Sequence, residues 1–187
     1  SGGGDQRVVV DLEGDAALQD ALAAAREASG SGSIDEQIAL LTNHVHQDIE
    51  YDKQSIGADE VSKDLLKAYR EAKNNNDVQA ANQLAQAYRH HVADSRRQSR
   101  YGADPDGRVN LGEMVTNDAV VCREKAIFMH VALADMGIES QVVIGKVSVD
   151  NGSGAAGGHA WVVLGDGTVI DGTWGAIYPG GQNYPVH

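Results

Sequence analysis

The sequence predicts an α+β fold in which several N-terminal helices precede one buried helix and a small antiparallel β-sheet. Three observations lead to this prediction. Residues 15 to about 100 are rich in Ala, Gln, Asp, Glu and Lys, and their apolar residues recur at helical spacing. The segment from Asp118 to Met136 is apolar on most sides, which is typical of a buried helix. Short β-rich runs separated by glycines follow it, as expected for helices packed on an antiparallel sheet.

The first two helices have recognisable ends. Asp11 or Asp15 can cap a first helix, which ends at the Ser-Gly-Ser-Gly-Ser run of residues 29–33. Ser33 is the expected N-cap of the second helix, with Glu36 at the capping-box position. The apolar face of this second helix comprises Ile38, Leu41, Val45 and Ile49.

A helical pair is expected next, over residues 58–72 and 77–100. The polar run Lys73-Asn74-Asn75-Asn76 breaks the helical pattern between them.

The buried helix and the strands complete the predicted core, over residues 108–176. Asn117 or Asp118 can cap the helix, and Gly137 is the natural residue to follow its end. The predicted strands are residues 141–149, 159–164 and 168–171, and the glycine-rich segment 151–158 separates the first two.

The whole chain of 187 residues is most simply one domain. Residues 1–14 are expected to be a partly disordered start, and Ser1-Gly2-Gly3-Gly4 resembles a cloning scar. The sequence shows no signal peptide and no apolar run long enough to span a bilayer. This pattern is compatible with a cytoplasmic protein or with one delivered into a host or target cell.

Cys122 is the first candidate site residue and the only cysteine in the chain. A single cysteine in an apolar helix is usually a small core residue. Cys122, however, lies near the start of the predicted helix, where free N–H groups and the helix dipole stabilise a thiolate. The same N–H groups could hold an oxyanion during acyl transfer. We therefore predict that Cys122 is a nucleophile.

His159 is the second candidate, because it alone among the seven histidines begins an apolar strand after a glycine-rich segment. Such segments suit a moving lid or the close approach of backbone to substrate. The alternative is a histidine that merely hydrogen-bonds locally. The pairs at 44 and 46 and at 90 and 91 lack the i,i+4 spacing of zinc ligands on one helix face, so we expect neither a metal site nor a cofactor.

The loop between the last two predicted strands decides whether Asp171 can meet His159. A two-residue turn at 166–167 would place Asp171 on the opposite face of the sheet. A three-residue loop at 165–167 pairs Trp161 with Asp171, so that Asp171 and His159 become diagonal neighbours on one face. Glycine at the left-handed position of a three-residue hairpin favours the second arrangement. We predict that Asp171 orients the imidazole of His159.

The order and spacing of Cys122, His159 and Asp171 resemble the transglutaminase-like cysteine superfamily, with its papain-like arrangement of thiol, imidazole and carboxylate. The resemblance covers roughly residues 34–57 and 108–176. The helical pair of residues 58–104 resembles no part of the superfamily core, so the resemblance implies that it is an insertion. The resemblance is carried by the motifs Cys122-Arg123-Glu124-Lys125-Ala126, Leu133-Ala134-Asp135-Met136-Gly137-Ile138, Val142-Val143-Ile144-Gly145, His159-Ala160-Trp161-Val162 and Asp171-Gly172-Thr173-Trp174.

The resemblance implies thiol-dependent acyl transfer on a protein glutamine or amide, of the transglutaminase or deamidase type. Cys122 would attack, His159 would move protons and Asp171 would hold His159, while Trp161 and Trp174 are the candidate substrate-binding residues. A cysteine peptidase or other amide hydrolase and a catalytically silent binding module are the alternatives, and either could be a delivered effector or toxin domain.

The expected partner is a protein or peptide substrate, and the sequence does not predict an oligomeric state. The net charge of −12 argues against nucleic acid as a partner, because nucleic-acid affinity depends on clustered Lys and Arg. The small basic cluster of Arg96, Arg97 and Arg100 is expected to be a solvated helix end. No membrane partner is expected either.

Overall fold

The computed structural model describes residues 7–53, 56–100, 107–148 and 156–187, with backbone only for residues 96–100 and 156. These residues form two compact units. One unit comprises residues 51–109 with Arg7, and the other comprises Val8–Glu50 and Asn110–His187. Residues 1–6, residues 151–155 of the predicted glycine-rich segment and the side chains of the predicted basic cluster lie outside the described part.

The first unit is built around helices α3 (Glu60–Asn74) and α4 (Val78–Arg100), close to the predicted ranges 58–72 and 77–100. Asp59 caps α3, because its carboxylate accepts the N–H of Ser62 at 3.1 Å and the hydroxyl of Ser62 at 2.6 Å. The other helix is tied to this cap by a 3.0 Å hydrogen bond between His91 Nε2 and Asp59 Oδ1. Asn76, at a φ of 56°, makes the turn between the helices.

Two short strands, β1 (Arg7–Val9) and β2 (Arg108–Asn110), pair with each other, and the boundary between the two units passes through them. Part of the predicted disordered start therefore forms a strand in the described structure.

The second unit contains α1 (Ala16–Ser29), α2 (Ile34–Gln47), the short α5 (Leu111–Thr116) and α6 (Cys122–Asp135). The predicted caps of the first two helices are confirmed. Leu18 N–H donates to Asp15 Oδ1 at 3.0 Å, and Glu36 N–H donates to the hydroxyl of Ser33 at 3.2 Å. The four residues predicted for the apolar face of α2 and the position after it are all buried: Ile38, Leu41, Val45 and Ile49.

The predicted start of α6 was wrong. The helix begins at Cys122 rather than near Asp118, and a separate short helix, α5, precedes it. Asp118 does not cap it but adopts a left-handed conformation with a φ of 53°. Its C-terminal end is as predicted: Gly137 has a φ of 78°, and Ile138 N–H closes the turn on Leu133 O at 2.9 Å.

The sheet of this unit is antiparallel throughout, in the order β3 (Ser140–Ser148), β4 (Ala156–Leu164), β5 (Val169–Asp171) and β6 (Ala176–Tyr178). The second strand starts earlier than predicted, because Gly157 and Gly158 pair with β3 instead of belonging to the preceding loop. The three-residue β6 was not predicted, and a short 3-10 helix, η2 (Pro179–Gly181), follows it.

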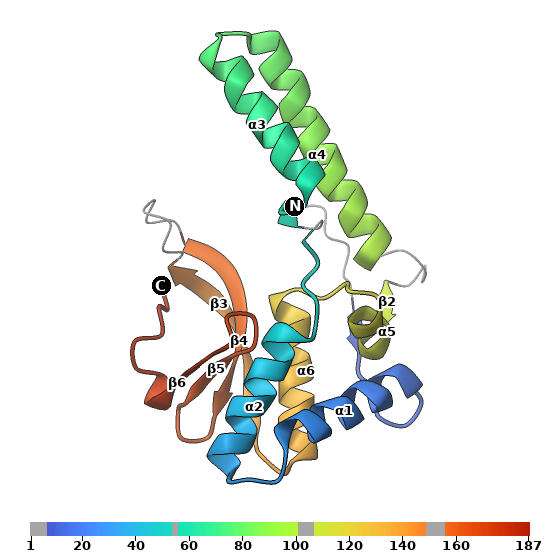
Figure 1. Cartoon of the computed structure of the whole chain (residues 1–187), viewed down its shortest axis with the longest axis vertical. Helices are drawn as coiled ribbons and strands as arrows, with labels where there is room; N and C mark the ends of the chain where they lie inside the picture. Colours follow the sequence, from blue (N-terminus) through green and yellow to red (C-terminus); the bar gives the residue numbers. More distant parts are fainter. Residues whose placement is uncertain (1–6, 54–55, 101–106, 149–155) are drawn as a thin grey trace. The chain divides into compact units, whose positions relative to one another are not determined.

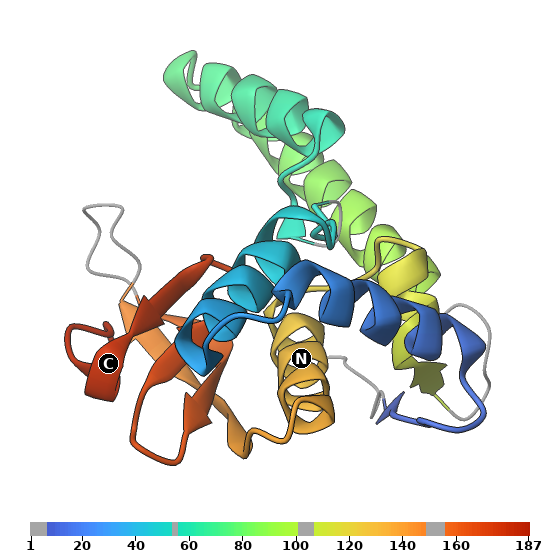
Figure 2. The same cartoon turned by 60° about the horizontal axis from the view of Figure 1, so that its bottom comes forward.

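Helices and strands pack together around α6, whose Phe128, Met129 and Leu133 are fully buried. Figures 1 and 2 show α2 and α6 beside the sheet, with α1 lying against the helices. A Cβ on Gly172, the residue after β5, would meet Val45 of α2 and Met129 of α6, so both helices pack closely against this end of the strand. The protein is thus α+β, as the sequence predicts. No helix among the described residues is both long and apolar enough to cross a membrane.

Candidate active site

The hairpin between β4 and β5 has the predicted three-residue loop. Val162 pairs with Ile170 and Val163 with Val169, and Leu164 N–H donates to Thr168 O at 2.9 Å. The loop is therefore 165–167, with Gly167 at a φ of 85°. Continuing the register places His159 and Asp171 on the same face of the sheet. Their side chains meet as predicted, because His159 Nε2 lies 2.7 Å from Asp171 Oδ2.

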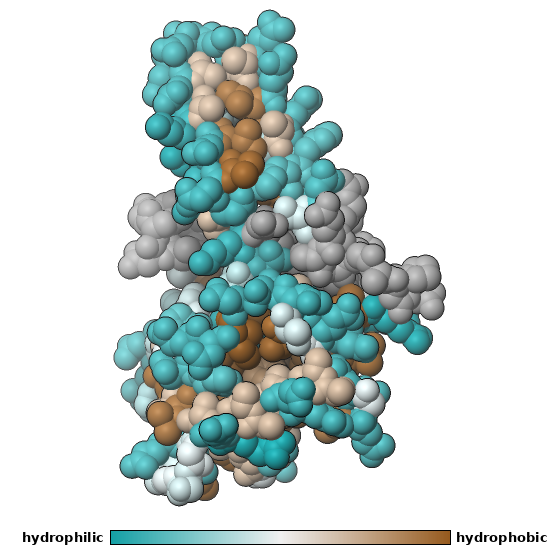
Figure 3. Space-filling view, turned by 45° about the vertical axis from the view of Figure 1, so that its right-hand side comes forward, coloured by the Kyte–Doolittle hydropathy of each residue, from teal (hydrophilic) through white to brown (hydrophobic). Residues whose placement is uncertain are grey.

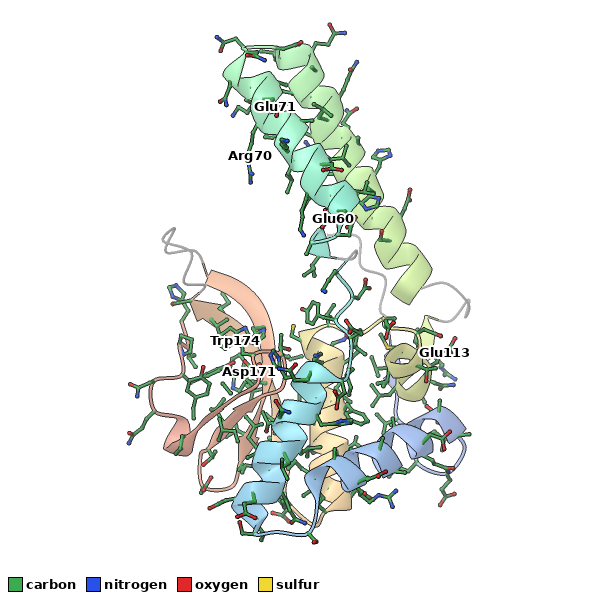
Figure 4. All side chains as sticks on the ribbon, in the orientation of Figure 1. Glu60, Arg70, Glu71, Glu113, Asp171 and Trp174 are labelled. Atoms are coloured by element: carbon green, nitrogen blue, oxygen red, sulfur yellow. The ribbon has the colours of Figure 1, made fainter. Side chains whose placement is uncertain are left out.

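Asp171 is fully buried, and both of its carboxylate oxygens are hydrogen-bonded. Oδ1 accepts the N–H groups of Thr173 at 3.0 Å and Trp174 at 2.9 Å. Oδ2 accepts the hydroxyl of Tyr184 at 2.8 Å in addition to the contact with His159. Figure 4 shows Asp171 and Trp174 near the sheet in the second unit. A carboxylate held at both oxygens has a fixed orientation toward the imidazole.

Cys122 is the first residue of α6, where the helix leaves its N–H groups without an intrahelical partner. Asp15, Ser33 and Asp59 cap the preceding helices with side chains, but in the described structure no side chain caps the first-turn N–H groups of α6. Glu124, which is fully buried, instead accepts the N–H of Val121 at 2.9 Å. The backbone N–H groups of Arg123 and of Ala160 in β4 both hydrogen-bond to the sulfur of Cys122.

The thiol and the imidazole are coupled. Cys122 hydrogen-bonds with the His159 side chain, whose Nε2 is held by Asp171, which leaves Nδ1 for the thiol. Burial alone would raise the pKa of Cys122, but the hydrogen bond and charge of His159, with the two N–H groups, lower it below its ordinary value. Burial alone would lower the pKa of His159, but hydrogen bonds to Asp171 and Cys122 raise it to about 9. Both shifts favour a thiolate–imidazolium pair.

The two predicted substrate-binding tryptophans lie in different surroundings. Trp174 is 37 % exposed and stacks on the imidazole of His159, with a centroid distance of 4.6 Å and an interplanar angle of 16°. Trp161 is only 4 % exposed and packs in a cluster with Val147, Val169 and Tyr184. Substrate contact is therefore retained as a proposal for Trp174, whereas Trp161 offers almost no accessible surface.

The contacts that two further residues make around the site were not predicted from the sequence. Lys125 is 2 % exposed, and its ammonium donates to Val45 O at 2.8 Å and His46 O at 3.2 Å at the end of α2. Burial lowers its pKa to about 8, although the charges of Glu50 and Asp171 oppose the change. His46 Nδ1 lies 2.8 Å from Thr173 O, so α2 also holds the turn that follows Asp171. Only the spacing Cys122-x-x-Lys125 on one helix hinted at the lysine.

Two further histidines of this unit hydrogen-bond to residues nearby in the sequence. His44 Nδ1 lies 2.7 Å from Asp48 Oδ2, and His130 Nδ1 lies 2.8 Å from the Ser140 hydroxyl. Within the described ranges, no group of three or more His, Cys, Asp or Glu side chains is arranged to hold a metal ion.

A family model described as the transglutaminase-like superfamily matches residues 65–177, which is more than half of the chain. The chain belongs to the transglutaminase-like superfamily. Cys122, His159 and Asp171 all lie within the match, which begins inside α3. No curated protein and no solved structure gave a significant match. The insertion of residues 58–104 into the superfamily core stays a prediction.

Transglutaminase-like proteins are generally cysteine enzymes, so membership supports cysteine-dependent acyl transfer or hydrolysis as the class of chemistry. It does not choose a reaction or a substrate, because one fold supports several of them.

Proposed function

We propose that this transglutaminase-like protein transfers the acyl group of a protein glutamine or other amide through a Cys122–His159–Asp171 triad. The observation that carries the proposal is the buried chain of hydrogen bonds from the thiol at the start of α6, through His159, to a carboxylate fixed at both oxygens. A histidine and cysteine that merely filled the core would not need a fully buried carboxylate behind them.

In the first step, the Cys122 thiolate attacks the amide carbonyl carbon and forms a carbon–sulfur bond. The carbonyl oxygen becomes an oxyanion, and the N–H groups of Arg123 and Ala160, which contact the sulfur, are the proposed donors to it. The imidazolium of His159 then gives its Nδ1 proton to the nitrogen of the amide. The carbon–nitrogen bond breaks, ammonia or an amine leaves, and a thioester remains on Cys122.

In the second step, neutral His159 takes a proton from the acceptor, which attacks the thioester and restores the thiolate. Water as acceptor gives a carboxylic acid, and a primary amine gives a new amide. The triad is the same in both reactions, so access to the thioester decides between them. Trp174, stacked on His159 and partly exposed, is the proposed wall of this access route.

The α3–α4 hairpin is the proposed docking element for an acidic protein substrate. Residues 60–100 carry eight of the fifteen Lys and Arg of the chain, three of them with side chains outside the described part, but only five of the twenty-seven Asp and Glu. Lys63, Lys67 and Arg70 are exposed at helical spacing on one side of α3, and Figure 4 shows Arg70 pointing away from α4. The hairpin also displays a group of hydrophobic residues bordered by polar ones in Figure 3. Such charge complementarity steers a negatively charged partner.

The test is mass spectrometry of casein, an acidic glutamine-containing protein, incubated with the protein and a fluorescent primary amine. We expect amine incorporation with loss of ammonia, or replacement of a side-chain amide by an acid, and neither with Cys122→Ala. Backbone cleavage would replace the proposal with a peptidase. No Cys122-dependent product from casein or from a set of other acidic proteins would favour the silent binding module.

A further inference from the structure

The hydroxyl of Tyr184 is bonded to the same carboxylate oxygen that holds the candidate catalytic histidine. It donates to Asp171 Oδ2 at 2.8 Å, and His159 Nε2 lies 2.7 Å from that oxygen. Tyr184 is 8 % exposed, so water does not compete freely for the carboxylate. It lies after the superfamily match, which ends at residue 177.

The segment that carries Tyr184 is fixed to the edge of the sheet. Ser148 N–H donates to Pro185 O at 2.8 Å, and His187 N–H donates to Lys146 O at 2.9 Å. Between them, Val186 forms a bridge with Val147 of β3. The backbone on the C-terminal side of Tyr184 is therefore paired with β3.

The ring of Tyr184 is enclosed by aromatic residues. Its centroid lies 5.0 Å from that of Trp161 and 5.6 Å from that of Trp174, the tryptophan that stacks on His159. Tyr178 meets it edge-on at 5.0 Å. These contacts restrict the ring to one orientation, so the hydroxyl is directed at Asp171.

We propose that Tyr184 is a positioning residue of the triad, which holds Asp171 Oδ2 and shares the charge that this oxygen presents to His159. The inference rests on the proposed function, because it assigns Tyr184 a role toward the same triad. A second donor on one carboxylate oxygen draws negative charge away from the first donor. The hydroxyl therefore limits how strongly Asp171 stabilises the imidazolium, which must give up its proton in the first chemical step.

The other titratable groups around this contact are Cys122, Lys125 and Tyr178. Burial and the nearby charge of Asp171 raise the pKa of Tyr184, so its hydroxyl remains a donor throughout the pH range in which His159 titrates. A change in the titration of His159 on removal of this hydroxyl can thus be assigned to the lost hydrogen bond.

The experiment compares wild type with Tyr184→Phe and with the matched control Tyr178→Phe. The control removes a hydroxyl from the same aromatic group, and the described structure gives Tyr178 no hydrogen bond to Asp171. The pKa of His159 is measured by NMR from its ring protons, and the rate of iodoacetamide alkylation of Cys122 is measured from pH 5 to pH 10. Near-ultraviolet circular dichroism checks that the aromatic packing is retained.

We expect the pKa of His159 to rise by roughly half a unit to one unit in Tyr184→Phe, and not in Tyr178→Phe. The acid side of the alkylation profile of Cys122 should move to lower pH with it, because a better stabilised imidazolium also stabilises the thiolate. An unchanged or lowered pKa of His159 in a folded Tyr184→Phe variant would overturn the inference. A wild-type Cys122 that is inert while the pKa of His159 still shifts would instead refute the proposed function alone, since the NMR titration does not depend on turnover.

Discussion

Asp171→Asn is the substitution that probes the proposed triad with the smallest change in shape. The amide oxygen of Asn can still accept the N–H groups of Thr173 and Trp174. Its NH2 group then faces His159 Nε2, which must accept a hydrogen bond instead of donating one. The single proton of the neutral imidazole then resides on Nδ1, which faces Cys122. Nδ1 can therefore no longer accept the thiol proton, and protonation at Nε2 would break the hydrogen bond from the new amide.

The magnitude follows from the pKa of His159, which is about 9 against an ordinary 6.5. That difference corresponds to about 3 kcal/mol, which Asp171 and Cys122 share. Loss of the Asp171 part, roughly 1.5–2 kcal/mol, should reduce the thiolate–imidazolium population and the alkylation rate of Cys122 at pH 7 by about 10- to 30-fold. Turnover should fall further, by about 10²- to 10⁴-fold, because the tautomer is also wrong.

Stability gives an independent measure of the same substitution. A histidine whose pKa is higher in the folded than in the unfolded state adds stability that is complete below about pH 6.5 and is lost as the pH rises through about 9. The loss of unfolding free energy in Asp171→Asn should therefore be greatest at or below pH 6.5 and should shrink by pH 9.

The assay is iodoacetamide alkylation with urea unfolding as the check on stability. Asp166→Asn is the matched control, because exposed Asp166 lies in the loop of the same hairpin and accepts the N–H of Thr168. An Asp171→Asn variant that folds and is alkylated at the wild-type rate would refute the reasoning, and so would an equal effect of Asp166→Asn.

Two further predictions concern the surroundings of the site and the docking element. Lys125 has a pKa of about 8 against an ordinary 10.5, so the unfolded chain binds more protons between these values and wild type gains stability as the pH rises. The free energy of unfolding of Lys125→Met relative to wild type should accordingly fall by about 2–3 kcal/mol from pH 8 to 10.5, and a constant difference in urea unfolding would contradict this. The double variant Lys67→Glu/Arg70→Glu should raise the KM for casein by about tenfold at low salt and leave kcat unchanged, whereas the control Arg108→Glu should change neither. A KM for casein that is the same in the double variant and in wild type would exclude the hairpin as the docking element.

The parts of the site that follow from local rules could be predicted from the sequence. The parity of the β4–β5 loop follows from Gly167 and the period of two along a strand, and it placed His159 and Asp171 on one face. The position of Cys122 at a helix start follows from the apolar segment after it. The caps Asp15 and Ser33 have local signatures as well.

Other features depend on contacts between distant segments, for which local sequence signals are weak or misleading. The start of α6 was misplaced because Asp118 looks like a cap, whereas the helix begins after Val121, whose N–H donates to the buried Glu124. Tyr184 and Lys125 reach the site through tertiary packing, from the last residues of the chain and from a buried helix face. Trp161 and Trp174 both contact Tyr184, but Trp161 packs into the buried cluster with Val147 and Val169 whereas Trp174 stays 37 % exposed, a difference that the sequence did not indicate.

The pH dependence of Cys122 alkylation in the wild-type protein tests the central claim most directly. Because the pKa of Cys122 is lowered, alkylation should stay fast at pH values below the titration range of an ordinary thiol, and this should be lost in His159→Ala but not in His130→Ala. A rate that falls about tenfold for each unit below pH 8 in wild type, as for an unperturbed cysteine, would contradict it.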